Sequence, residues 1–100
     1  AIVYYEKALE LEPDHVITHG RLALALAAVG RIDEAIKECR FVLKKRPKDA
    51  EMHFNVGVLL EKQGKLDEAI KSYQQALQIN PDYTEASKHL NAALAKQKNR

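Results

Sequence analysis

The fold is decided by a stretch that occurs twice, as GRIDEAIKECRFVLKKRPKD at residues 30–49 and as GKLDEAIKSYQQALQINPDY at residues 64–83. Both copies begin with a glycine, continue through Asp-Glu-Ala-Ile-Lys, and reach a proline, Pro47 in the first copy and Pro81 in the second. The copies are one 34-residue period apart, and the same interval separates Pro13 from Pro47. A fixed period of this length indicates a repeat protein in which each period forms one supersecondary unit.

Within a period the apolar residues have helical spacing. Leu22, Leu26 and Val29 fall at i, i+4 and i+7, and a second apolar stripe resumes after Gly30. A glycine supplies the turn that ends the first helix, and a proline ends the second because the residue before it disfavours helical backbone. The sequence therefore predicts an all-α chain without strands, with helices at about 1–12, 15–29, 32–46, 49–63, 66–79 and 83–97.

Two kinds of residue add detail to these helices. Asp14, Asp49 and Asp82 follow the prolines, where a cap or a first-turn acid would begin the next helix. Small residues recur where two helices are expected to approach closely, and a bulkier side chain there would force the pair apart. The small residues of this kind are Ala8, Ala35, Gly57, Ala69 and Ala76.

Composition limits the classes of function. The chain has 100 residues, of which 46% are hydrophobic and 30% charged, so we expect one soluble domain with a modest core. A net charge of +2 does not indicate a nucleic-acid or membrane partner. The longest apolar run, Leu22 to Val29, is well short of a membrane span. The single Cys39 allows no intramolecular disulfide and predicts a small buried hydrophobe.

The repeat resembles the tetratricopeptide repeat family, a 34-residue helix-turn-helix. The second complete period matches its pattern at Val56-Gly57, Gly64, Ala69, Tyr73, Ala76 and Pro81. The first matches more loosely at Leu22-Ala23, Gly30, Ala35, Cys39, Val42 and Pro47, and a partial period matches at Ala1, Tyr5, Ala8 and Pro13. The resemblance implies a right-handed α-solenoid of antiparallel helical hairpins.

We expect residues 1–100 to form a single domain of this family. Residues 1–14 would be the second half of a truncated repeat, 15–48 and 49–82 complete repeats, and 83–100 a polar capping helix and tail. Because Ala1 falls in the middle of the helical pattern, we expect the chain to be a piece of a longer array, with helix 1–12 left uncapped.

The resemblance also implies a function and a surface. The family's usual ligand surface is the concave face built from the first helices of the repeats, so we expect a non-catalytic scaffold that binds a peptide or helix there. The expected contact residues are Ile17, Gly20, Leu24, Ala27, Ala28, Glu51, Phe54, Asn55, Val58, Glu61, Lys62, Glu85, Lys88 and Ala92. We hypothesise that four of them form an apolar groove for the partner segment: Ile17, Leu24, Phe54 and Val58.

Other interpretations of the same residues are weaker. Gly20 and Leu24 stand where some relatives carry the lysine and asparagine of a carboxylate clamp, although Asn55 matches one expected amide. His15 and His19 share the spacing of one helix face, but a packing role for His19 and His53 is favoured over a metal site. The basic cluster Lys44, Lys45, Arg46 and Lys48 is interpreted as a solvated helix end.

No catalytic motif, cofactor or metal site is predicted, and the expected partner is a protein or peptide rather than nucleic acid or a membrane. Two alternatives stay open. In the first alternative, the chain is a structural array that self-associates through helix 1–12. In the second, it is a regulatory or targeting segment of a larger enzyme. The compartment is not indicated by the sequence.

Overall fold

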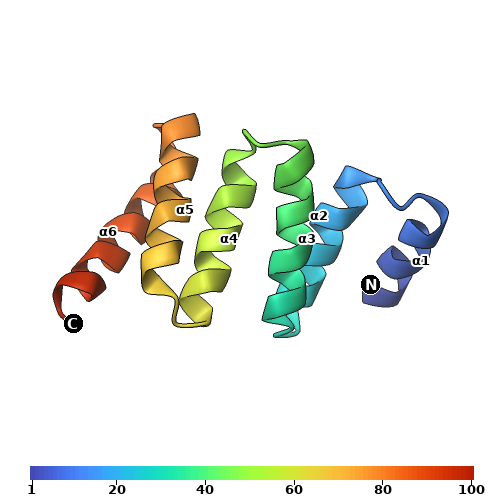
Figure 1. The fold of residues 1–100 in the computed structure, drawn as a ribbon, viewed down its shortest axis with the longest axis horizontal. Coiled ribbons are helices and arrows are strands. Elements are labelled where there is room, and N and C mark those ends of the chain that lie inside the picture. Colours follow the sequence, from blue (N-terminus) through green and yellow to red (C-terminus); the bar gives the residue numbers. More distant parts are fainter. The chain divides into compact units, whose positions relative to one another are not determined.

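A computed structural model describes all of residues 1–100 and contains six α-helices and no strands (Figure 1). The helices are α1 (Ile2–Leu11), α2 (Val16–Ala28), α3 (Ile32–Lys45), α4 (Ala50–Lys62), α5 (Leu66–Ile79) and α6 (Thr84–Lys98). The predicted all-α fold is confirmed, and each helix begins and ends at or next to its predicted bounds. None of the six combines the length and the hydropathy that a membrane span requires.

The helix ends follow the chemistry of a few residues. Gly30 and Gly64 adopt φ values of 83° and 79°, a left-handed conformation that favours glycine and turns the chain between the two helices of a hairpin. Asp49 caps α4, because its side chain accepts a hydrogen bond from the Met52 amide at 3.0 Å. The capping role expected of Asp14 and Asp82 is wrong: His15 caps α2 through its ring, and α6 has no side-chain cap.

The chain divides into two compact units, Ala1–Pro47 and Lys48–Arg100. The first holds α1 to α3 and the second α4 to α6, so the division falls at a predicted repeat boundary. Helices α2 and α3 pack as one hairpin and α4 and α5 as another, while α6 packs on α5. That residues 1–100 act as one domain stays a prediction.

The first unit has its core between α2 and α3. The buried side chains are Leu22, Ala23, Leu26, Ala35, Ile36, Cys39 and Val42. Cys39 is 1% exposed, as expected of a small hydrophobe inside the hairpin. Helix α1 buries none of its residues, and Val3, Tyr4 and Leu11 are all largely exposed. The first unit therefore depends on one hairpin for most of its apolar burial.

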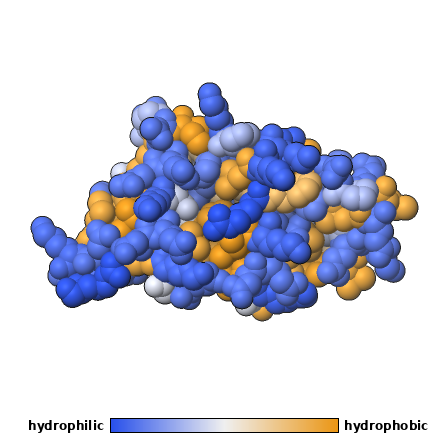
Figure 2. All heavy atoms as spheres, in the orientation of Figure 1, coloured by the Kyte–Doolittle hydropathy of each residue, from blue (hydrophilic) through white to orange (hydrophobic).

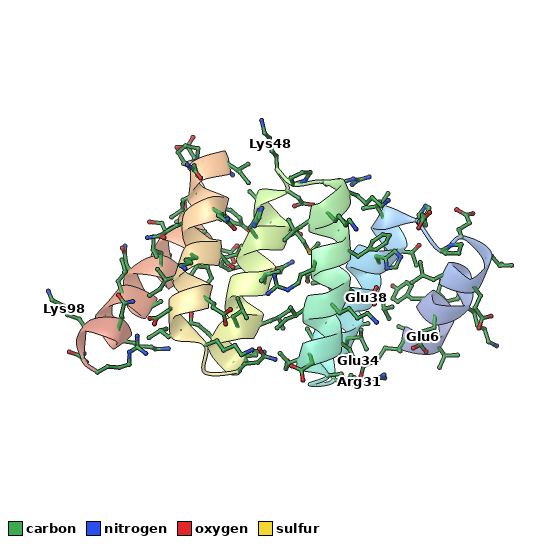
Figure 3. The ribbon with its side chains drawn as sticks, viewed as in Figure 1. Glu6, Arg31, Glu34, Glu38, Lys48 and Lys98 are labelled. Carbon is green, nitrogen blue, oxygen red and sulfur yellow. The ribbon has the colours of Figure 1, made fainter.

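Polar contacts tie the first unit's hairpin together as well. His19 on α2 bonds through Nδ1 to Glu38 Oε1 on α3 at 2.5 Å and through Nε2 to the Pro13 carbonyl at 2.7 Å. Its ring stacks on Phe41, with the centroids 3.7 Å apart. Figure 3 shows Arg31 and Glu34 together at the start of α3, where the guanidinium forms a bidentate pair with the carboxylate. His19 thus packs against α3 of its own hairpin.

The second unit has its core between α4 and α5. The buried side chains include Met52, Phe54, Val56, Leu59 and Leu60 from α4 and Ala69, Ile70, Tyr73 and Ala76 from α5. The predicted close approach occurs at Gly57, where an added Cβ would lie 2.5 Å from Cε1 of the Tyr73 ring. Ala35, Ala69 and Ala76 are each 0% exposed, so helices also meet at these three positions, whereas Ala8 on α1 is only half-buried. Figure 2 shows how polar side chains cover most of one face of the molecule, with apolar surface between them.

Candidate functional site

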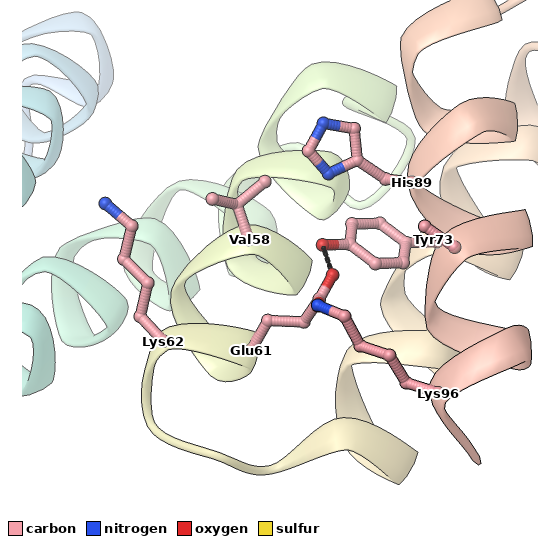
Figure 4. A pocket seen from close by; sticks show the side chains of 7 residues that line it. Val58, Glu61, Lys62, Tyr73, His89 and Lys96 are labelled. Atoms are coloured by element: carbon pink, nitrogen blue, oxygen red, sulfur yellow. Dashed lines mark hydrogen bonds and ion pairs between the residues drawn. The ribbon is translucent and has the colours of Figure 1, made fainter. Parts of the chain in front are cut away.

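An open groove lies in the second unit between α4 and α6, with α5 beneath it (Figure 4). We call it the α4–α6 groove, and its volume is about 410 Å³. It is lined by Val58, Glu61, Lys62, Tyr73, His89, Ala92 and Lys96. These residues come from α4, α5 and α6, so the groove depends on the packing of all three helices.

Glu61 is the polar centre of the groove. Its Oε1 accepts a hydrogen bond from the Tyr73 hydroxyl at 2.6 Å, and its Oε2 accepts one from the Lys96 ammonium at 3.1 Å. Burial opposes ionisation of the carboxyl, but the two hydrogen bonds outweigh burial, so the pKa of Glu61 lies below its ordinary value. The groove therefore contains a fixed carboxylate at neutral pH.

The base of the groove is aromatic. Tyr73 is 0% exposed, and burial together with the adjacent Glu61 raises the pKa of its phenol, so the hydroxyl stays a donor. Its ring centroid lies 5.8 Å from that of Phe54 and 5.7 Å from that of His89. Phe54 also meets His89 edge-on at 4.9 Å, so an aromatic cluster supports the groove from below.

The rim of the groove is charged and exposed. Figure 4 shows the side chains of Lys62 and Lys96 on opposite sides of Glu61, with His89 beyond the Tyr73 ring. Lys96 crosses from α6 to reach Glu61 on α4 and keeps its side chain 64% exposed. Val58 and Ala92 add aliphatic side chains to this lining.

Four of the predicted contact residues lie together in the groove: Val58, Glu61, Lys62 and Ala92. Phe54 does not line it. Its side chain is 8% exposed, because the ring packs among Tyr73, Tyr83 and His89. Phe54 therefore supports the groove from below instead of lining it. The other predicted residues of the second unit lie outside the groove lining: Glu51, Asn55, Glu85 and Lys88.

The predicted residues of the first unit lie on α2. Ile17 and Leu24 are 49% and 54% exposed, and Ala28 is exposed, whereas Gly20 and Ala27 are half-buried. An apolar surface is thus present on α2, as its composition indicates. That this surface and the α4–α6 groove form one concave face stays a prediction.

The sequence reasoning missed Tyr73, His89 and Lys96 as groove residues. From the sequence, Tyr73 is only a match to the repeat pattern, and the other two fall in the predicted polar capping helix. A signal was available for both, because His89 lies one repeat period after Asn55 and Lys96 lies one repeat period after Lys62. Extending the predicted face by one full period would have placed both on the same face as Val58 and Ala92.

The histidines lie in no cluster of potential metal ligands. His15 bonds to Thr18, His19 bonds to Glu38 and the Pro13 carbonyl, and no cluster of potential metal ligands is brought together. A second hollow of about 480 Å³ lies along α5 and is lined by Lys71, Gln74, Gln75 and Gln78. All four side chains that line this hollow are polar and exposed.

Helical hairpins with a 34-residue period, packed through small residues, define a helical-repeat protein. Two sequence profiles described as Tetratricopeptide repeat match the chain, one over residues 21–84 and the other over residues 4–37. The chain therefore belongs to the tetratricopeptide repeat family. A curated relative, the TPR repeat-containing thioredoxin TTL4 of Arabidopsis thaliana, is 38% identical over 53 residues, which is 53% of this chain and 8% of that protein.

Solved structures share the fold. MamA 41-end from Desulfovibrio magneticus RS-1 superposes with a TM-score of 0.92 at 21% identity, over 97% of this chain and 55% of that one. YrrB, described as a TPR protein with an unusual peptide-binding site, gives 0.84 at 26% identity, over 89% of this chain and 46% of that one. The first TPR of Spaghetti (RPAP3), bound to the HSP90 peptide SRMEEVD, gives 0.90 at 21% identity, over 97% of this chain and 77% of that one.

Proposed function

We propose that the chain is a non-catalytic protein-interaction module that binds a peptide or helix of a partner in the α4–α6 groove. The observation that carries this proposal is the groove itself, whose lining combines the aliphatic side chains of Val58 and Ala92 with the Tyr73 ring and the charged groups of Glu61, Lys62 and Lys96. An apolar surface with a few placed polar groups is the usual form of a ligand site. The peptide-bound state of Spaghetti and the peptide-binding site named for YrrB support it.

The exposed apolar residues of α2 are proposed as a second part of the contact surface. Leu24 lies one repeat period before Val58, and Val58 one period before Ala92, so these three occupy the same position in successive repeats. Leu24 and Ile17 are about half-exposed, which leaves them available to a partner. The remaining predicted residues of this face, Gly20, Ala27, Ala28, Glu51, Asn55, Glu85 and Lys88, are proposed as its periphery.

A binding measurement tests the groove. Twelve-residue peptides are selected from a random display library on the wild-type chain, and their affinities are then measured by fluorescence polarisation. We expect Val58→Asp and Ala92→Trp each to weaken binding at least about tenfold. The aspartate places a charge on an aliphatic part of the lining, and the tryptophan fills part of the groove. The matched control, Gln75→Trp, places the same bulky side chain on the exposed outer face of α5 and leaves affinity unchanged.

The variants must remain folded for this comparison to be informative. Ala92 is exposed, so the tryptophan replaces no core contact, and helical circular dichroism with an unchanged unfolding midpoint verifies this. Selected peptides that bind both groove variants as tightly as wild type would refute the groove as the binding site.

Self-association through α1 is a second candidate, because Val3, Tyr4 and Leu11 expose apolar surface on one helix. Light scattering across a concentration series distinguishes the two functions. A molecular mass that rises with concentration and falls back in a Val3→Glu, Leu11→Glu variant favours self-association, whereas a monomer at all concentrations excludes it.

A further inference from the structure

The hydrogen-bonding capacity of the α4–α6 groove is unbalanced toward donors. An ammonium group has three N–H donors and no acceptor. Lys96 donates to Glu61, and Lys62 takes part in none of the chain's salt bridges. Glu61, the only carboxylate in the lining, is already engaged on both oxygens. A ligand that satisfies the groove must therefore bring acceptors.

The groove lining also carries a net positive charge. The lining contains two ammonium groups and one carboxylate, and that carboxylate is held by the hydroxyl of a fully buried tyrosine. The acidic residues near the ends of the helices do not enter the lining: Glu51 and Glu85 lie outside it, and Asp67 pairs with Arg100. Lys62 therefore keeps an unneutralised positive charge at the edge of an apolar surface.

The positions of these groups determine what a ligand must look like. In Figure 4, Lys62 extends to one side of Val58, and the pair formed by Glu61 and Lys96 lies on the other. A side chain seated on Val58 would thus have the Lys62 ammonium group on one side of it. Charge-assisted hydrogen bonds next to an apolar surface are stronger than those in open water.

We propose that the α4–α6 groove selects a segment in which an aliphatic side chain is followed or preceded by an acidic one. The aliphatic group lies on Val58 and Ala92, and the ammonium group of Lys62 binds the side-chain carboxylate. This inference rests on the proposed function, because it names the class of segment that the same groove would take.

Three synthetic peptides test the inference by fluorescence polarisation at low salt. The first is a twelve-residue peptide with leucines flanked by glutamates and both ends blocked. The second replaces every glutamate by glutamine, and the third is the glutamine peptide with a free terminal carboxylate. We expect the glutamate peptide to bind about fivefold or more tightly than the other two, with the preference falling as salt is raised.

Lys62→Gln tests the assignment to a residue, and Lys71→Gln is its matched control. Both lysines are exposed, and both substitutions remove one positive charge, but Lys71 lies on the outer face of α5. We expect Lys62→Gln to weaken binding of the glutamate peptide and leave binding of the glutamine peptide unchanged. Lys71→Gln should change neither.

The outcomes distinguish failure of this inference from failure of the proposed peptide binding in the groove. If the glutamate and glutamine peptides bind equally while Ala92→Trp weakens both, the groove binds peptides without acidic selection and only the inference fails. If the third peptide binds as tightly as the first, the groove binds a terminal carboxylate, and the assignment to a side-chain carboxylate is overturned. If the glutamate peptide shows no binding at concentrations up to about 1 mM, the inference is also overturned.

Discussion

At the scale of single residues, the contact between Gly57 and Tyr73 decides how α4 lies on α5. The Tyr73 ring is fully buried, and its edge occupies the space that a side chain at position 57 would need. In the first unit the repeat-equivalent positions hold Ala23 and Cys39, both 1% exposed. A larger residue on the first helix is thus accompanied by a smaller one on the second, so the two hairpins fill their cores with different pairs of residues.

Gly57→Ala should lower the free energy of unfolding by about 1–3 kcal/mol, because the new methyl group would overlap the Tyr73 ring. Urea denaturation followed by circular dichroism measures the change. In a Tyr73→Cys background, which reproduces the Ala23 and Cys39 pair, the same substitution should cost clearly less. Equal costs in both backgrounds would show that the contact is not the cause.

The Glu61 carboxyl should make stability depend on acid pH. Its pKa is below the ordinary value of 4.5, so the unfolded chain binds more protons as pH falls through this region. The stabilisation is present above pH 4.5 and is lost as pH falls through the folded pKa. Urea unfolding of Glu61→Gln between neutral and acid pH should show a smaller loss than wild type, and an identical loss would contradict this assignment. Glu68→Gln, at an exposed position on α5, is the control.

At the scale of helices, the sequence predicted the elements well because each boundary depends on local chemistry. Glycine in a left-handed turn and proline after a helix act on their immediate neighbours, and the repeat period marks them again and again. The position of Phe54 was not predictable in the same way. Helical phase places it on the expected contact face, but the ring is covered by Tyr83 and His89, which approach only when α6 has packed. Burial of that kind depends on tertiary packing.

The Asp49 cap gives a prediction for one element. Asp49→Ala should reduce the free energy of unfolding by about 1 kcal/mol, since the Met52 amide loses its acceptor. Asp49→Asn should retain most of the stability, because an asparagine oxygen can accept the same hydrogen bond. Chemical denaturation of both variants compares them. Lys65→Ala, at the start of α5 where no side-chain cap exists, is expected to have little effect.

At the scale of the whole molecule, burial is unevenly distributed along the repeats. Helix α5 buries Ala69, Ile70, Ser72, Tyr73 and Ala76, whereas α1 buries none of its residues. Repeat arrays gain stability from each hairpin and from its neighbours, so elements with little buried surface are expected to open first. The same unevenness limits what the sequence could predict of the site. The face of α4, and its extension to His89 and Lys96, could be predicted from the period, whereas the contribution of Tyr73 depends on how three helices meet.

Hydrogen exchange followed by mass spectrometry tests this distribution. Amides of α1 should exchange fastest among the six helices, and those of α4 and α5 slowest, since protection follows local burial. Exchange in α1 as slow as in α5 would show that the stability of α1 does not depend on its own burial.

Nuclear magnetic resonance gives the sharpest test of whether the α4–α6 groove is a peptide-binding site. A peptide selected on the wild-type chain is titrated into isotope-labelled protein, and amide shifts are followed for every helix. We expect the largest shifts around Val58, His89 and Ala92, while Gln74 and Gln78 on the outer face of α5 do not move. Shifts that concentrate on α5, or that leave α4 and α6 unchanged at saturation, would contradict peptide binding in this groove.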